Sequence, residues 1–191
     1  MENRILLIDD EPNILAAIRR VLVDEPYEIL AAESAEKALE ILAETSCKVV
    51  ISDERMPGMG GAELLCRINE MYPETVRILL TGHASIDAAM KAVNSGEIYR
   101  FFTKPWNDLD LRMAIRSALE KYDLEAENRQ LLSLVRKQAN ELKSIEERYP
   151  GITQVEKDKD GSIYLPEISD EEMVELVKEW SEDPSGNVEE T

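Results

Sequence analysis

The chain has 191 residues, of which 43% are hydrophobic and 32% charged, and its formal net charge is −18. This length suits one well-buried domain with an extension, and the negative charge argues against a nucleic-acid-binding surface, which needs clustered Lys and Arg. Because no run of about 18 apolar residues occurs, we predict no membrane span and no membrane partner. Two cysteines without metal or redox spacing, and no signal-peptide pattern, predict a cytoplasmic protein.

Short apolar runs rich in β-branched residues alternate with amphipathic segments through residue 122. The runs predict strands, and the segments between them predict helices. Five strand–helix units in succession predict a parallel sheet with helices on both faces. Strands are expected at 4–8, 27–31, 48–52, 76–81 and 98–102, and helices at 12–24, 35–44, 61–71, 85–94 and from about 107 onward.

Several connections between these elements carry local signals. Pro12 suits a first helical turn, and Ser34 and Ser85 are candidate N-caps, because a hydroxyl oxygen can accept from a free backbone N–H there. Glycine clusters mark chain segments with few conformational restrictions. A flexible loop is therefore predicted just after the third strand, at Gly58, Gly60 and Gly61.

Polar side chains stand at the carboxyl ends of four predicted strands: Asp9 and Asp10 after the first, Asp53 after the third, Thr81 at the fourth and Lys104 after the fifth. Parallel α/β sheets place their ligand crevice at this edge. Mg²⁺ prefers oxygen ligands, and a cation, an ammonium and a hydroxyl together can neutralise a phosphoryl group. The set therefore predicts Mg²⁺-dependent phosphoryl transfer onto an aspartate.

Because five separated positions agree in type, order and place, residues 1–122 resemble the receiver domain of two-component response regulators. The resemblance implies a flavodoxin-like α/β fold with strand order 2-1-3-4-5. It also implies that Asp53 accepts the phosphoryl group and binds Mg²⁺. Asp10 would be a direct ligand of the metal, Asp9 would reach it through water, and the backbone carbonyl of Arg55 would be a further ligand.

The same resemblance implies roles for residues on the last two strands. Thr81 would hydrogen-bond the phosphoryl oxygens, Lys104 would pair with them, and a cis peptide bond before Pro105 would aim that lysine inward. Thr81 and Phe101 would form the conformational switch, in which Phe101 fills the space that Thr81 leaves. A core phenylalanine that never changes its rotamer is the alternative for Phe101.

Two neighbouring positions are expected to influence how long the phosphate lasts. Arg55 follows Asp53 by two residues and His83 follows Thr81 by two, so both would flank the path of an attacking water. Arg55 would pair with the phosphoryl group or block water. His83 is the only histidine and can titrate near neutrality, but an exposed loop histidine without a role is equally compatible with the sequence.

The last helix of the receiver is predicted to continue well beyond it. No proline or glycine occurs between Asn107 and Pro150, so one helix of roughly 60 Å is expected. A heptad pattern predicts that residues 123–149 form a parallel two-stranded coiled coil, kept in register by a buried Asn. A helix that folds back on its own domain is the alternative. The predicted seam consists of Leu124, Asn128, Leu131, Val135, Gln138, Leu142, Ile145 and Tyr149.

The end of the chain reads as a small acidic appendage. Residues 151–191 carry 13 acidic and 3 basic side chains. Turn residues between two short apolar runs predict a β-hairpin at 150–168. We favour it over a Ca²⁺-binding loop of matching spacing, because the first ligand position is Glu rather than Asp, Pro166 precedes the last ligand and Pro150-Gly151 disfavours an entering helix. A capping-box pattern predicts a short helix at 169–181. Residues 182–191 are predicted to be a disordered tail.

The expected function is that of a two-component response regulator whose Asp53 is phosphorylated by a sensor histidine kinase. Output would come from phosphorylation-dependent homodimerisation and an unidentified downstream protein, without a DNA-binding domain. The chain would catalyse only its own phosphorylation and dephosphorylation. Residues 99–106 resemble receivers attached to c-di-GMP phosphodiesterases of the HD-GYP type, so a piece of such an enzyme regulator is one alternative. A coiled-coil scaffold that no longer switches is another, although the intact acidic set argues against it.

Overall fold

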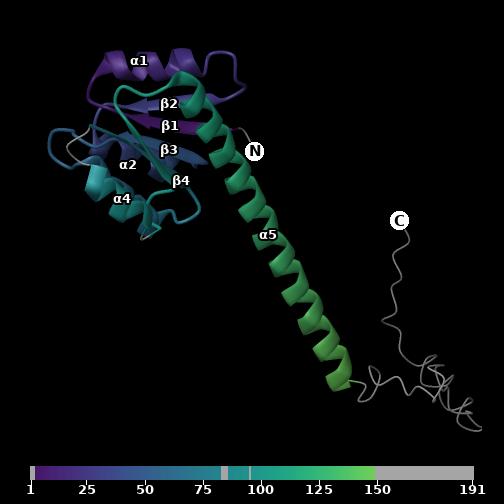
Figure 1. Cartoon of the computed structure of the whole chain (residues 1–191). Helices are drawn as coiled ribbons and strands as arrows, with labels where there is room; N and C mark the ends of the chain where they lie inside the picture. Colours follow the sequence, from purple (N-terminus) through teal and green to yellow (C-terminus); the bar gives the residue numbers. More distant parts are fainter. Residues whose placement is uncertain (1–2, 83–85, 95, 149–191) are drawn as a thin grey trace, which may run out of the picture. The chain divides into compact units, whose positions relative to one another are not determined.

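A computed structural model describes residues 3–82, 86–94 and 96–148. Strands and helices alternate along this part of the chain, as predicted (Figure 1). No helix within the described ranges is long and apolar enough to cross a membrane. The elements are β1 (Arg4–Ile8), α1 (Pro12–Val21), β2 (Glu28–Ala32), α2 (Ala35–Glu44), β3 (Val49–Asp53), α3 (Gly61–Met71), β4 (Val76–Thr81), α4 (Ile86–Asn94), β5 (Arg100–Thr103) and α5 (Asp108–Arg148).

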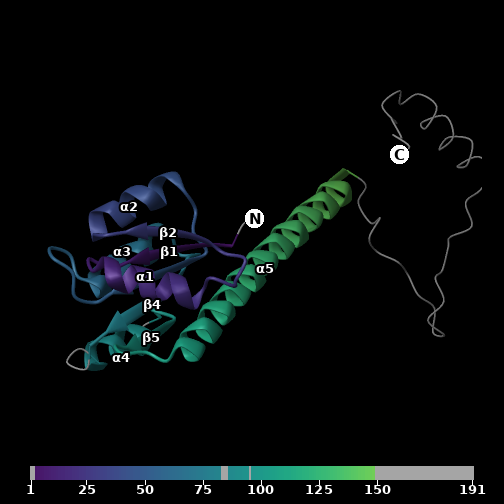
Figure 2. The same cartoon turned by 90° about the horizontal axis from the view of Figure 1, so that it is seen from above.

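The strands form one parallel sheet in the order β2-β1-β3-β4-β5, which confirms the predicted flavodoxin-like topology. Figures 1 and 2 show the sheet between two layers of helices. Side chains of alternate residues point to opposite faces of a strand. Ile5 and Leu7 of β1 accordingly pack with α1 and α5, whereas Leu6 and Ile8 pack with α2, α3 and α4. Burial on both faces explains why the strands are almost continuously apolar.

The predicted boundaries are correct for β1, β4, α2 and α3, and they differ elsewhere. Helix α1 ends at Val21 rather than 24, because the backbone N–H of Leu22 closes the last turn and the next residues form a turn. Strand β5 begins at Arg100 rather than 98, because the N–H of Ile98 bonds to the carbonyl of Ala92 in the last turn of α4. Strands β2 and β3 each begin one residue later than predicted.

Two of the predicted helix-start signals lie within the described residues. Pro12 opens α1, and the Ser34 hydroxyl accepts a hydrogen bond from the backbone N–H of Lys37 at 3.2 Å, as an N-cap should. The predicted N-cap Ser85 lies outside them. Before α5, the Asn107 side-chain oxygen accepts from the N–H groups of Leu109 and Asp110, at 2.9 and 3.1 Å. These bonds satisfy donors that have no partner inside the helix.

Helix α5 continues without a break for 41 residues, which confirms the predicted long helix. The chain divides into two compact units, Met1–Leu134 and Val135–Thr191, with the boundary inside this helix. Residues 111–119 supply its buried side chains, and the described residues of the predicted seam are all exposed. The coiled coil and the domain boundaries remain predictions. Tyr149, the hairpin, the short helix and the acidic tail lie outside the described residues.

Candidate functional site

The polar residues singled out in the sequence meet at the carboxyl edge of the sheet. Asp9 follows β1 directly, Asp53 is the last residue of β3, and Thr81 is the last residue of β4. Strands β1 and β3 are neighbours, and so are β3 and β4. Asp9 is 1% exposed, Asp53 7% and Thr81 0%. Polar side chains are rarely buried to this extent without partners, so their contacts define what the site can do.

Lys104 joins two of the carboxylates. Its Nζ lies 2.8 Å from Asp9 Oδ2 and 2.5 Å from Asp53 Oδ1. The peptide bond between Lys104 and Pro105 is cis, as predicted. Burial disfavours the lysine's charge, but its hydrogen bonds to Asp53 and Asp9 outweigh burial and raise the pKa of Lys104. The lysine is therefore charged at neutral pH and pairs with one carboxylate oxygen of Asp53.

Asp9, Asp10 and Asp53 offer carboxylate oxygens that lie within 4.8 Å of one another. Asp10 is exposed, and the other two are buried. Burial raises the pKa of Asp9, the negative charge of Asp53 adds to this, and Lys104 opposes it. One ammonium thus contacts two of the three clustered carboxylates. A donor set made only of oxygens, open to solvent on one side, fits Mg²⁺, which binds few protein ligands and keeps several waters.

The loop after β3 orients Asp53. The backbone N–H of Arg55 donates a hydrogen bond to Asp53 Oδ2 at 2.9 Å, and the N–H of Glu11 does the same for Asp9 Oδ1 at 2.9 Å. The Arg55 side chain reaches toward the end of β4, since a Cβ on Gly82 would lie 3.4 Å from a guanidinium nitrogen. Arg55 thus lies at the site, whereas its carbonyl as a metal ligand remains a prediction. His83 lies outside the described residues.

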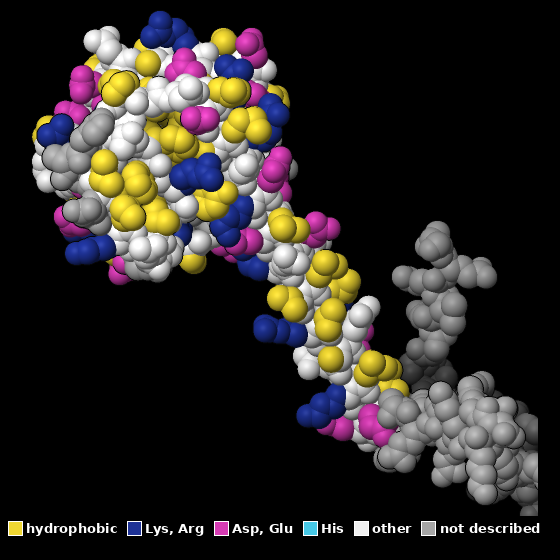
Figure 3. Space-filling model, in the orientation of Figure 1, with side chains coloured by type: hydrophobic (Ala, Val, Ile, Leu, Met, Phe, Trp, Pro, Cys, Tyr) yellow, Lys and Arg dark blue, Asp and Glu magenta, His cyan; other side chains and the backbone are white. Residues whose placement is uncertain are grey.

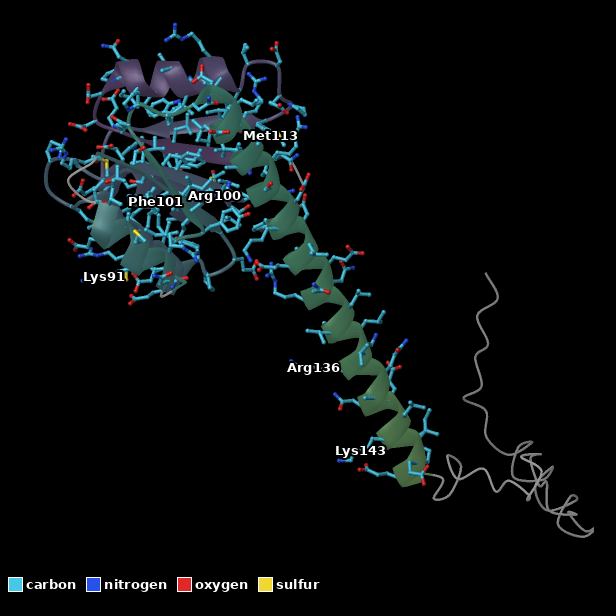
Figure 4. All side chains as sticks on the ribbon, in the orientation of Figure 1. Lys91, Arg100, Phe101, Met113, Arg136 and Lys143 are labelled. Carbon is cyan, nitrogen blue, oxygen red and sulfur yellow. The ribbon has the colours of Figure 1, made fainter. Side chains whose placement is uncertain are left out.

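The two residues predicted to switch lie on neighbouring strands. The Thr81 hydroxyl donates to the carbonyl of Gly82 at 3.2 Å, and the Thr81 carbonyl accepts from the N–H of Lys104 at 2.8 Å. Phe101 is partly buried against the apolar cluster of α2, α3 and α4, and Figure 4 places it on β5 beside α4. A movement of Phe101 linked to Thr81 remains a prediction.

Gly61 has a role at the site that the sequence analysis missed. The sequence placed it both in a flexible loop and at the start of a helix, and in the structure it is buried and opens α3. A Cβ at this position would lie 1.9 Å from the Asp53 carbonyl oxygen and 2.7 Å from the carbonyl carbon. The helix start is thus pressed against the backbone of the phosphoacceptor candidate, with the Gly61 N–H bonded to Glu54 O at 3.0 Å. A glycine at the first position of a predicted helix was the available signal.

Comparison with known proteins gives the class to which this fold and site belong. Residues 5–116 match the response regulator receiver domain, so the chain belongs to that family. The match ends inside α5, before the part of the helix that the coiled-coil prediction concerns. Receiver domains generally interact with sensor histidine kinases and bind Mg²⁺ through acidic residues like those gathered here.

Individual relatives agree with this assignment. The chain is 35% identical, over 127 residues, to the hydrogenase transcriptional regulatory protein HoxA of Cupriavidus necator, and the match covers 66% of this chain and 26% of HoxA. This chain spans only 26% to 36% of the length of the first curated relatives that it matches. A signal receiver domain of an HD domain-containing protein from Pseudomonas fluorescens Pf-5 is 42% identical, with a TM-score of 0.61, over 64% of this chain and 98% of that chain. A structure described as adenylate cyclase from Rhodopirellula baltica is 34% identical, with a TM-score of 0.67, and the match covers 70% of this chain and 98% of that chain.

Proposed function

We propose that this receiver domain accepts a phosphoryl group on Asp53 from a sensor histidine kinase and acts as a cytoplasmic signalling switch. The observation that carries this proposal is the contact of one partly buried ammonium, Lys104, with the carboxylates of Asp9 and Asp53 next to the exposed carboxylate of Asp10. Such a set holds a cation and a phosphoryl group together, and phosphoryl transfer depends mainly on this positioning and neutralisation.

In the proposed transfer, a carboxylate oxygen of Asp53 attacks phosphorus while the bond to the kinase's histidine nitrogen breaks. The histidine keeps the electron pair of that bond. The Arg55 N–H holds Asp53 Oδ2 in place, and Lys104 shifts its pairing from the carboxylate to a phosphoryl oxygen. Bound Mg²⁺ supplies further neutralisation of the phosphoryl oxygens. Dephosphorylation is the attack of water on the same phosphorus, with Asp53 leaving as a carboxylate. In this proposal the chain catalyses only its own phosphorylation and dephosphorylation.

Phosphorylation by a small donor tests this chemistry without knowledge of the kinase. The chain would be incubated with acetyl phosphate, with Mg²⁺ or with EDTA, and its intact mass measured. We expect the mass of one added phosphoryl group only with Mg²⁺, and none in Asp53→Asn. The matched control is Asp123→Asn, which makes the same Asp-to-Asn change at an exposed position on α5 away from the site. Phosphorylation of Asp53→Asn to the wild-type level would contradict the proposal.

The output proposed is assembly with a second copy through α5. The support is the series of exposed apolar side chains on this helix, which Figure 3 shows as hydrophobic groups along its length. They recur at a spacing that suits a parallel two-stranded coiled coil. Phosphorylation would change this assembly through Thr81 and Phe101. The described apolar residues of the predicted seam, here called the apolar stripe, are each between 44% and 60% exposed: Leu124, Leu131, Val135, Leu142 and Ile145.

Substitutions in the apolar stripe of α5 test dimerisation independently of the phosphorylation of Asp53. Leu131→Asn should shift the solution mass from dimer toward monomer, because it places an amide in the apolar seam, and should leave phosphorylation of Asp53 unchanged. Gln130→Asn changes the neighbouring exposed position outside the seam and should leave the mass unchanged. If wild type is monomeric at every concentration with and without phosphorylation, the proposed dimer is wrong.

A second candidate is a receiver that regulates an attached enzyme. The observation in its favour is the 42% identity to the receiver of an HD domain-containing protein. The curated relatives, which include proteins named as transcriptional regulators, are also longer than the matched region. Reading the gene on both sides of this sequence decides between the candidates, because an attached catalytic or DNA-binding domain would place the output there rather than in α5.

A further inference from the structure

Lys48 is a buried cation that the proposed phosphoryl chemistry does not use. It stands immediately before β3, at the opposite end of the strand from Asp53, and is 7% exposed. Its backbone is fixed on both sides, since its N–H bonds to Arg4 O at 2.9 Å and its carbonyl accepts from Val76 N–H at 2.8 Å. A buried ammonium requires partners. Their identity shows what the residue does.

Two of these partners lie on α5, just beyond the helix's buried segment. Lys48 Nζ lies 2.6 Å from Asp123 Oδ1 and 5.7 Å from the centre of the Tyr122 ring, and it donates to Asn3 Oδ1 at 2.8 Å. The ammonium thus makes an ion pair and a cation–π contact with consecutive residues of one helix turn. Because Asp123 is 75 positions away from Lys48 in sequence, the contacts tie the helix to the sheet.

A second tie lies further along the same helix. Arg129 Nε is 3.1 Å from Glu74 Oε1, in the connection between α3 and β4. Exposed ion pairs contribute little stability individually. Here, however, Arg129 lies about two turns beyond Tyr122, so the two ties together restrict the direction of the helix as well as its position.

The ties and the apolar stripe use different faces of α5. Tyr122 and Leu124 are two positions apart, and so are Arg129 and Leu131, which places the members of each pair about 200° apart around the helix axis, and Asp123 lies about 100° from Leu124. Leu124 and Leu131 are 59% and 52% exposed. The contacts with the receiver therefore leave the stripe accessible to another chain.

We propose that five residues form a clamp that fixes the first turns of the helical extension to the receiver: Lys48, Glu74, Tyr122, Asp123 and Arg129. The clamp would turn the apolar stripe toward a second copy of this chain. The proposed clamp does not require that Asp53 can be phosphorylated. Its role in assembly rests on the proposed dimer, and the clamp can be tested without it. The receiver and the clamped turns of α5 would then move as one body.

The test measures the spread of distances between two labels in the full-length chain. Cysteines replacing the exposed residues Glu70 on α3 and Ser133 on α5 carry the spin labels, in a chain with Cys66→Ser, and an excess of unlabelled protein removes signals between chains. We expect a narrow distribution in wild type and a clearly broader one in Lys48→Met, which keeps an apolar stem of similar length. Amides near residues 122–129 should exchange about tenfold faster, as expected for the loss of one charge-assisted hydrogen bond.

Lys37→Met is the matched control, because it breaks an exposed Lys37–Glu40 ion pair of 2.8 Å on α2 and should change neither readout. If Lys48→Met does not fold, Asp123→Asn and Glu74→Gln remove the clamp from its exposed side. Equal distance spreads and equal exchange in wild type and in these variants would overturn the clamp. Failure of phosphorylation at Asp53 would leave it standing, so the two proposals fail separately.

Discussion

Replacing Gly61 by alanine should damage both the stability of the receiver and its chemistry. The added Cβ would lie 1.9 Å from the Asp53 carbonyl oxygen, so α3 or the Asp53 backbone must move by about 1 Å. Overpacking of this kind costs about 1–3 kcal/mol. Weakening of the 3.0 Å hydrogen bond from Gly61 N–H to Glu54 O adds about 1 kcal/mol. We therefore expect a loss of about 2–4 kcal/mol, which corresponds to a fall in Tm of about 6–15 °C for a domain of this size.

Thermal unfolding followed by circular dichroism would measure this fall. The phosphorylation rate with acetyl phosphate should drop as well, because Asp53 moves with its backbone. Gly60→Ala is the matched control, since its Cβ would lie 3.2 Å from Glu54 O and requires only a small adjustment. That variant should lose less than about 1 kcal/mol. Equal Tm values for Gly61→Ala and Gly60→Ala would refute the reasoning.

Three further predictions concern the charges and thiols. The raised pKa of Lys104 means that its ion pairs stabilise the fold fully below the unfolded lysine pKa of about 10.4, and that this stabilisation is lost as pH rises through the folded pKa. In EDTA, the difference in unfolding free energy between wild type and Lys104→Met should thus be constant from about pH 6 to 9 and change only at higher pH. A change in this difference between about pH 6 and 9 would contradict the prediction. Asp10→Asn should weaken Mg²⁺ binding at least about tenfold in calorimetry, and unchanged affinity would remove Asp10 from the site. Burial raises the pKa of Cys47 to about 11, so at pH 8 iodoacetamide should label Cys66 much faster than Cys47, as peptide mass spectrometry can measure.

The sequence predicted where the candidate site residues lie, because their positions depend on strand ends. Once Asp53 and Thr81 were assigned to the ends of buried parallel strands, the topology of the sheet brought them together without knowledge of any side-chain contact. The cis bond before Pro105 followed from the family resemblance and is present in the structure. The boundaries that were predicted wrongly, such as the start of β5, depend on turn hydrogen bonds that leave no periodic pattern in the sequence.

The remaining features depend on approaches between distant residues. Nothing near Lys48 in the sequence indicates that its ammonium pairs with Asp123, because residues 75 positions apart meet only after α5 has packed on the sheet. The same holds for Gly61, whose close approach to Asp53 depends on where the loop between them returns. The glycine cluster indicated a flexible loop, whereas Gly61 is packed tightly against the Asp53 backbone at the predicted start of α3.

The central claim is that phosphorylation of Asp53 controls assembly through α5. Its most direct test is the solution mass by light scattering, with Mg²⁺, with and without beryllofluoride as a stand-in for the phosphoryl group, for wild type and Asp53→Asn. The account predicts that beryllofluoride shifts wild type from monomer to dimer and leaves Asp53→Asn unchanged. The same mass for wild type in both conditions, whether monomer or dimer, would contradict it.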